Sequence, residues 1–260
     1  FVVDKKPNDK AILSNSKTIF LNNNKFNQID DARSVYKIIK NKKIEYIIVD
    51  DYRINEKWEN FFYNKGYKII VIDDLANRKH KCDFLIDSGW HGLSKTSKRY
   101  QYLKPKKCIE LLGPKYSIIN PKLKKIKKEK NKLNILIYFG GGNHIVRFYK
   151  IIKKILTNLE KNKLIKINIV LGTYADPKKL FFNLKKKFKN LKIIKKNFDL
   201  TNIVSETDFY IGSNSSIIYE LSYLNIPRIL ICLNRAQKID INEFQKLGNY
   251  FYFENKNKLN

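Results

Sequence analysis

The feature that most constrains the fold is a regular alternation of short apolar runs with amphipathic stretches along the chain. Short runs that end in aspartate or glycine are typical of parallel strands, and the stretches between them are typical of covering helices. The clearest runs are residues 44–49, 68–72, 84–86 and 133–139. The sequence therefore predicts the α/β class, with repeated β-α units and mostly parallel sheets.

A run of charged residues divides the predicted elements into two groups. Residues 121–132 are dominated by lysine, which is typical of a solvated linker rather than of a core element. We therefore expect two Rossmann-like domains, residues 1–127 and 128–260. Ligands of open parallel sheets bind at the carboxyl ends of the strands, so we expect the two domains to face a cleft.

Composition excludes several classes of protein. Apolar residues make up 43% of the 260 residues, too many for a disordered chain. No run of about 18 apolar residues occurs, and residues 1–4 lack the features of a signal peptide, so we expect a cytoplasmic protein without a transmembrane segment. The sequence lacks methionine and opens on apolar residues, which predicts that the N-terminal domain is truncated at its start.

The cysteines and histidines carry neither a metal-binding nor a disulfide pattern. No cysteine belongs to a CxxC pair, and no histidine stands at ligand spacing. The residues concerned are Cys82, Cys108, Cys232, His80, His91 and His144. We therefore expect core thiols, structural histidines and no metal site.

A formal net charge of +29 makes a non-catalytic protein that binds nucleic acid or anionic lipid one possible class. Only seven of the 53 basic residues are arginine, however, and the arginine fork is the group that favours specific phosphate and base contacts. Lysine, asparagine and isoleucine are enriched together, as in a coding sequence rich in A and T. We expect no specific nucleic-acid partner.

A glycine-rich turn follows the strand predicted over residues 133–139. Gly140, Gly141 and Gly142 lead through Asn143 into an amphipathic stretch. Backbone N–H groups of such a turn can approach an anion without interference from a Cβ atom. The segment matches neither GxGxxG nor GxxxxGK[ST], so it predicts either a phosphate-binding loop or an ordinary tight turn.

A second small-residue segment runs from Gly212 through Ser213, Ser215 and Ser216 into a predicted helix that carries Glu220. Hydroxyl and N–H groups at a helix start can hold a diphosphate, and a carboxylate one turn further can accept the two hydroxyls of a ribose. The alternative interpretation is helix capping by serine with a glutamate that compensates the helix dipole.

Carboxylates gather in the first half, and several of them sit at predicted strand ends. They are Asp50, Asp51, Asp73, Asp74, Asp83 and Asp87. Such groups can act as acid and base or bind a metal ion, and a single aspartate at a strand end also commonly caps the next helix.

Several ordered motifs together resemble one family. Residues 49–52, 58–59, 72–78 and 80–87 form a serial match to the UDP-2,4-diacetamido-2,4,6-trideoxy-β-L-altropyranose hydrolase family of pseudaminic acid biosynthesis. The chain also resembles the family's LxGxxY segment at residues 112–116 of the first half, and in the second half its FGG loop at 139–141 and its GxxxSxxxE element at 212–220. The family is in turn similar to the peptidoglycan N-acetylglucosaminyltransferase, which has the GT-B architecture of two Rossmann-like domains.

The resemblance implies an enzyme that needs no metal or cofactor. Water displaces UDP at the anomeric carbon of the UDP-sugar with inversion, and Tyr52 stands at the position of the active-site tyrosine. The backbone around Phe198 is implied to lie near uracil, and Glu220 to bind the ribose. The implied substrate-binding residues are Gly140, Gly141, Gly142, Asn143, Phe198, Ser213, Ser215, Ser216, Glu220 and Gln237.

The chain departs from the family pattern at two points. The family's general base is a histidine in a GxGHxxR loop after the first strand, and no GxGH occurs here. The family usually has aspartate where Asn143 stands. A GT-B glycosyltransferase that uses a UDP-sugar donor therefore remains the alternative enzyme, because one UDP site serves hydrolysis or transfer. The sequence does not define an oligomeric state.

Overall fold

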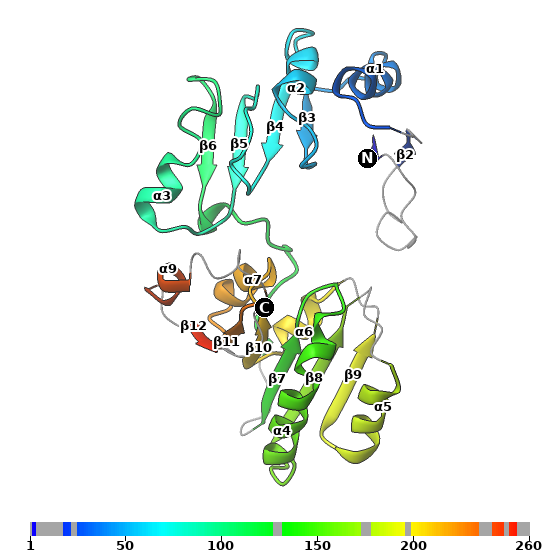
Figure 1. Cartoon of the computed structure of the whole chain (residues 1–260), viewed down its shortest axis with the longest axis vertical. Coiled ribbons are helices and arrows are strands. Elements are labelled where there is room, and N and C mark those ends of the chain that lie inside the picture. The colour runs from blue at the N-terminus through cyan, green and yellow to red at the C-terminus, as the bar shows by residue number, and fades with distance from the viewer. Residues whose placement is uncertain are drawn as a thin grey trace. The chain divides into compact units, whose positions relative to one another are not determined.

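The computed structural model describes residues 2–3, 18–21, 25–126, 132–172, 178–195, 199–233, 241–246 and 250–253. The chain divides into two compact units, Phe1–Ile118 and Ile119–Asn260. Each unit contains its own parallel sheet with helices, as Figure 1 shows. The predicted α/β class is thereby confirmed.

The first unit is built on a four-stranded parallel sheet in the order β3-β4-β5-β6. Its strands are β3 (Tyr46–Val49), β4 (Lys68–Ile72), β5 (Phe84–Asp87) and β6 (Ile109–Leu112). Its helices are α1 (Gln28–Ile39), α2 (Glu56–Tyr63), α3 (Leu93–Lys98) and the 3₁₀ helix η2 (Pro114–Tyr116). A separate parallel pair consists of β1 (Val2–Val3) and β2 (Ile19–Phe20).

Asparagine side chains start the first two helices of this unit. The side chain of Asn27 accepts hydrogen bonds from the N–H groups of Ile29 and Asp30, and Asn55 accepts one from Lys57 N–H. These bonds satisfy N–H groups that have no partner within the helix. Helices α1 and α2 then bury Val35 and Phe62 in the core of the unit.

Strand β3 forms one edge of this sheet within the described residues. A groove of about 750 Å³ lies beside it, and its lining includes aliphatic side chains of β3 and α1. Ile48 of β3 is 64% exposed, although alternate strand residues such as Val49 are buried. The helices therefore cover one face of β3 more completely than the other.

The second unit is built on a six-stranded parallel sheet in the order β12-β11-β10-β7-β8-β9. Its strands are β7 (Leu133–Tyr138), β8 (Ile165–Leu171), β9 (Leu191–Lys195), β10 (Phe209–Ser213), β11 (Arg228–Ile231) and β12 (Tyr250–Phe253). Its helices are η3 (His144–Phe148), α4 (Tyr149–Leu159), α5 (Lys178–Lys187), α6 (Thr201–Ser205), α7 (Ile217–Tyr223) and α9 (Ile241–Lys246). Its core consists mainly of aliphatic residues of the central strands, packed with Phe181 of α5 and with Phe188, which directly follows α5.

The structure places the division between the units at 118/119, whereas the sequence placed it at 127/128. Leu123 is only 4% exposed, and Ile126 N–H donates to Ser205 O of α6 over 3.2 Å. The Asn120 side-chain amide also donates to the Thr201 hydroxyl over 2.7 Å. The first part of the lysine-rich run thus belongs to the second unit, because one leucine among exposed lysines is buried there.

Among the helices of the described residues, none combines the length and apolar composition that a membrane span requires.

Candidate functional site

The two small-residue segments singled out from the sequence lie at the same edge of the second sheet. Strands β7 and β10 pair in parallel, with Gly212 opposite Tyr138. The glycine turn follows β7, and the serine-rich segment begins at the end of β10. Parallel pairing in this register brings the two segments together at the carboxyl ends of neighbouring strands.

Close backbone contacts require glycine at two positions around this edge. A Cβ atom on Gly212 would lie 1.8 Å from Tyr138 O, and one on Gly172 would lie 2.3 Å from Gly140 O. Gly140 itself has a φ of +84°, which side chains with a Cβ rarely adopt. These three residues therefore fix the course of the turn between β7 and η3.

Ser213 provides a buried polar group beside this turn. The residue is 1% exposed, and its Oγ makes no hydrogen bond within the described residues. The same Oγ lies 3.9 Å from the position of a Cβ on Gly140. A buried hydroxyl without a partner costs about 1–3 kcal/mol, so Ser213 Oγ is a polar atom that the described residues leave unsatisfied.

The phenol of Tyr210 connects the ends of strands β7 and β10. Its hydroxyl lies 2.8 Å from Tyr138 O and 3.1 Å from Ser213 O, and its single proton is shared between these two carbonyls. Burial is the main cause that raises the pKa of Tyr210, so the phenol stays protonated and remains a donor. Tyr210 thereby holds the backbone of Tyr138, before the glycine turn, close to the backbone of Ser213.

The N-terminus of α7 lacks the side-chain capping bond that the capping interpretation predicts. Ser216 occupies the cap position, but its side chain makes no capping hydrogen bond, and the backbone carbonyls of Ser215 and Ser216 accept from Ile218 and Tyr219. Helix α7 has only 7 residues, so its dipole contributes little. The buried Ser213 hydroxyl and the glycine turn are therefore the stronger indications of an anion site.

Glu220 lies in the first turn of α7 and is half-buried. Burial, and after it the nearby carboxylate of Asp199, raise its pKa. Asp199 is itself held by the Thr201 N–H group over 2.9 Å at the start of α6. Glu220 is thus positioned near this edge with an acidic neighbour. Of the other predicted binding residues, Asn143 is exposed, and Phe198 and Gln237 lie outside the described residues.

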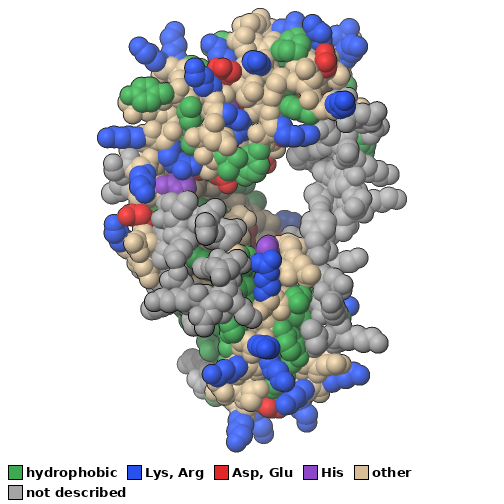
Figure 2. All heavy atoms as spheres, viewed as in Figure 1, with side chains coloured by type: hydrophobic (Ala, Val, Ile, Leu, Met, Phe, Trp, Pro, Cys, Tyr) green, Lys and Arg blue, Asp and Glu red, His purple; other side chains and the backbone are tan. Residues whose placement is uncertain are grey.

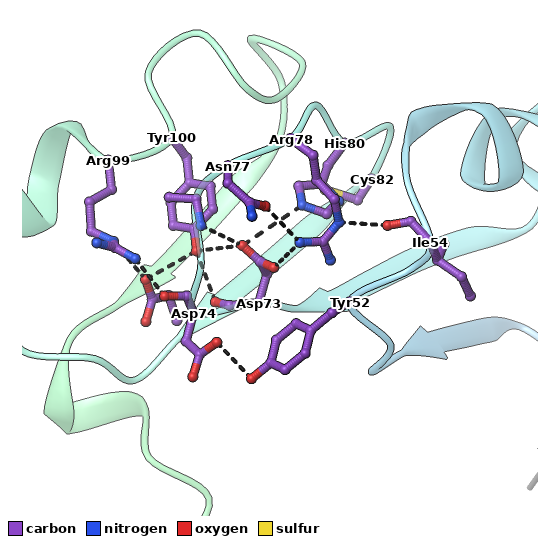
Figure 3. Close-up of polar contacts among 12 residues, drawn as sticks. Tyr52, Ile54, Asp73, Asp74, Asn77, Arg78, His80, Cys82, Arg99 and Tyr100 are labelled. Carbon is purple, nitrogen blue, oxygen red and sulfur yellow. Dashed lines mark hydrogen bonds and ion pairs between the residues drawn. The ribbon is translucent and has the colours of Figure 1, made fainter. Parts of the chain in front are cut away.

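Of the carboxylates singled out in the first unit, all but Asp83, which precedes β5, lie at the carboxyl ends of β3, β4 and β5, and the structure separates them by environment. Tyr52 is 57% exposed, and its hydroxyl donates to Asp74 Oδ1 over 2.8 Å, as Figure 3 shows. Partial burial and then the Asp74 carboxylate raise the pKa of Tyr52 to about 12. Burial and the charges of Asp74 and Asp51 also raise the pKa of Asp50. These groups form an accessible acidic edge.

Asp73, by contrast, is a buried brace of the connection from β4 to β5. Its carboxylate accepts from Ala76 N–H, from the Tyr100 hydroxyl and from the Arg78 guanidinium at 2.9, 2.9 and 2.5 Å. Burial opposes ionisation, but these bonds outweigh it and lower the pKa of Asp73. The Tyr100 hydroxyl also lies 3.1 Å from Asp87 Oδ2, so the network extends to the end of β5. Figure 3 shows the contact between Tyr100 and Asp73.

The buried pair His80 and Glu59 supports the same connection. His80 Nδ1 lies 2.7 Å from Glu59 Oε1, and Lys81 N–H donates to the other carboxylate oxygen over 2.5 Å. Both side chains are fully buried. His80 therefore holds the loop after β4 in place, as a structural histidine does. Among the described residues no group of three His, Cys, Asp or Glu side chains is arranged to hold a metal ion.

Basic side chains do not form a single patch on the visible surface. On the face that Figure 2 shows, lysine and arginine side chains are spread over both units. A focused nucleic-acid interface would instead gather them on one face or along one helix.

Solved structures show that the chain has the GT-B fold. Acinetobacter baumannii MurG matches with a TM-score of 0.56 and 12% identity, over 97% of this chain and 76% of the other. The glycosyltransferase of kitacinnamycin matches with a TM-score of 0.61 and 9% identity, over 94% and 75%.

Two curated proteins are similar in sequence. The UDP-2,4-diacetamido-2,4,6-trideoxy-β-L-altropyranose hydrolase of Campylobacter jejuni is 26% identical over 223 residues, which are 84% of this chain and 78% of the relative. An uncharacterised protein of Methanocaldococcus jannaschii is 27% identical over 226 residues, and the match spans 83% of this chain but only 46% of that relative. No protein-family model matches the chain.

The brace formed by Tyr210 predicts a specific effect of Tyr210→Phe. The substitution keeps the ring but removes the hydroxyl, so both carbonyls lose their donor, at a cost of about 1–2 kcal/mol. We expect amide hydrogen exchange in residues 139–143 and 213–216 of the unliganded protein to rise by roughly 5- to 30-fold. The matched control Tyr100→Phe, in the first unit, should leave these segments unchanged. Equal exchange in Tyr210→Phe and wild type would contradict this role.

The lowered pKa of Asp73 predicts that the first unit loses stability in acid. A carboxyl with a folded pKa below its ordinary value of 3.8 stabilises fully above that value, and the contribution is lost as the pH falls through the folded pKa. Asp73→Asn should lower stability at neutral pH by about 1–3 kcal/mol and flatten the acid dependence. Both tryptophans, Trp58 and Trp90, belong to the first unit, so fluorescence-detected urea unfolding measures it. If the stability of the variant and of the wild type depends on pH in the same way, Asp73 does not have this stabilising role.

Proposed function

We propose that the chain binds a UDP-sugar through the second unit and hydrolyses it, with UDP-2,4-diacetamido-2,4,6-trideoxy-β-L-altropyranose as the substrate. The observation that carries the proposal is the buried, unpartnered Ser213 hydroxyl beside the Gly140 turn. The GT-B fold and the similarity to the Campylobacter jejuni hydrolase support the choice of a sugar nucleotide.

The proposed diphosphate site uses the N–H groups of the glycine turn together with the Ser213 hydroxyl. A Cβ on Gly141 would meet no atom within 4 Å, so there is room beside the turn for a phosphate oxygen. Ser215, Ser216 and Asn143 would add polar contacts at the same edge. Donors fixed in this way bind a dianion without the cost of reorganising around it.

The proposed nucleoside contacts are made by the neighbouring elements. The Glu220 carboxylate would accept hydrogen bonds from both ribose hydroxyls, which favours its charged form and offsets the raised pKa. Phe198 and Gln237 are proposed to contact the uracil and the substrate. Each of these assignments rests on the resemblance to the hydrolase family.

The proposed reaction is displacement of UDP by water. The water oxygen forms a bond to the anomeric carbon and releases one proton to the solvent, the anomeric C–O bond breaks, and UDP leaves with the bonding electrons. The donors around Ser213 would stabilise the charge that develops on the departing phosphate. Tyr52 would serve as a neutral hydrogen-bond donor to the sugar, because a pKa of about 12 keeps its phenol protonated at neutral pH.

A glycosyltransferase is the second candidate, since the glycosyltransferase of kitacinnamycin is among the solved structures that match in fold. Such an enzyme would use the same UDP site but would direct an acceptor hydroxyl to the anomeric carbon. The fate of the sugar distinguishes the two candidates.

The proposed binding site predicts that Ser213→Ala weakens the binding of UDP. Loss of one hydrogen bond to a charged oxygen should cost about 1–2 kcal/mol, or roughly 5- to 30-fold in Kd. Glu220→Ala should cost about 1–3 kcal/mol for the same reason. Ser205→Ala is the matched control, because Ser205 is also a buried serine of this unit but lies on α6. Titration calorimetry with UDP measures all three, and an unchanged Kd in both site variants would reject the site.

The proposed activity predicts release of free sugar and UDP from the UDP-sugar without an acceptor. In water enriched in ¹⁸O the label should enter the sugar and not the phosphate, because the anomeric C–O bond breaks. Mass spectrometry locates the label. Turnover that requires an added acceptor would support the glycosyltransferase instead, and label in UDP would exclude attack at the anomeric carbon.

A further inference from the structure

Two thiols outside the proposed nucleotide site lie in contact in the first unit. Cys82 Sγ and Cys108 Sγ are 3.6 Å apart. Both residues are buried, at 2% and 7% exposure. Cys82 lies in the connection from β4 to β5, two residues before β5 begins, and Cys108 immediately precedes β6. Neither thiol has a part in the proposed binding or chemistry.

The backbone holds these cysteines together. Phe84 and Ile109 are paired in the parallel register of β5 and β6. Ile109 N–H also donates to Asp83 O over 2.8 Å. These two residues directly follow Cys108 and Cys82 in the sequence. To form a disulfide bond of about 2.0 Å, the sulfur atoms need to approach by roughly 1.6 Å. Side-chain rotation at two neighbouring strand ends supplies a movement of this size.

The two thiols differ in reactivity. Cys108 is the more exposed of the pair. The hydrogen bond from Cys82 lowers the pKa of the Cys108 thiol despite its burial, and the Lys104 charge contributes in the same direction. Since the thiolate is the attacking species in thiol–disulfide exchange, Cys108 is the nucleophile and Cys82 the resolving thiol.

We propose that Cys82 and Cys108 are a redox-active pair that forms a reversible disulfide with a small disulfide such as oxidised glutathione. The Cys108 thiolate attacks one glutathione sulfur, and the first glutathione thiolate leaves. The Cys82 thiol then attacks Cys108 Sγ, and the second glutathione leaves and takes up the Cys82 proton. The two cysteines lose two electrons and two protons in total, and the oxidant becomes two molecules of reduced glutathione.

The link would tie the β4–β5 connection to the start of β6. That connection also carries Asp73, Asp74 and Arg78, so oxidation cross-links the segment that bears part of the acidic edge. A cross-link restricts the unfolded chain more than the folded one. The oxidised first unit should therefore melt several degrees above the reduced one.

The test is peptide mapping of the full chain in glutathione buffers of increasing oxidised fraction. Remaining thiols are alkylated under native conditions, and trypsin then releases residues 82–95 and 108–115 as separate cysteine peptides, because lysines flank both. We expect these two peptides to become covalently joined under oxidising conditions and to separate after reduction with dithiothreitol. Cys232, on residues 229–235, should stay outside the link and serves as an internal control.

Cys108→Ser is the matched variant, and Cys82→Ser provides the reciprocal one. Each should abolish the joined peptide and the rise in melting temperature. The proposal is overturned if both peptides remain separate at every glutathione ratio in the native protein, since the thiols are then inert core residues. It is equally overturned if joining requires prior unfolding in urea, or if the cysteines link to Cys232 instead of to each other.

Discussion

The parallel pairing of β7 with β10 is the interaction on which the candidate nucleotide site depends. It brings together two segments that are about 70 residues apart in sequence, and it does so with almost no space between the backbones. Gly212 permits the approach, because any Cβ at this position would collide with the Tyr138 carbonyl and the Tyr210 ring. The site is therefore a consequence of strand packing, and its polar groups are positioned by the sheet rather than by flexible side chains.

The carboxylates of the first unit fall into two groups, one buried and structural and the other exposed to solvent. Asp73 and Asp87 are buried and neighbour arginine or tyrosine, so they hold the loops at the strand ends. Asp74 and Tyr52 remain accessible and form a hydrogen-bonded pair. A row of similar residues in the sequence thus contains both braces and candidate functional groups, and burial is the property that distinguishes them.

Much of the fold follows from the sequence, because strand periodicity and strand-end residues are local signals. The predicted runs at 68–72 and 133–139 correspond to β4 and β7, and the glycine turn and the serine segment proved to be neighbours. The compact units divide nine residues before the boundary that the sequence predicts, since one buried leucine, Leu123, is a weak signal among many lysines.

Two features had no usable sequence signal. Tyr210 resembles an ordinary apolar strand residue, and its role as a donor depends on carbonyls 72 and 3 positions away. The contact between Cys82 and Cys108 depends on the register of β5 and β6, which the spacing of the cysteines does not reveal. Both are long-range consequences of sheet packing, which only the folded structure displays.

The central claim is that the glycine turn and Ser213 receive the same diphosphate. Mapping of backbone amide chemical shifts during a titration with UDP tests it most directly. The expected result is a saturable set of shifts concentrated in residues 140–142 and 213–216, with inorganic sulfate causing weaker shifts at the same amides. Saturable shifts confined to other parts of the chain, with both segments unaffected, would contradict it.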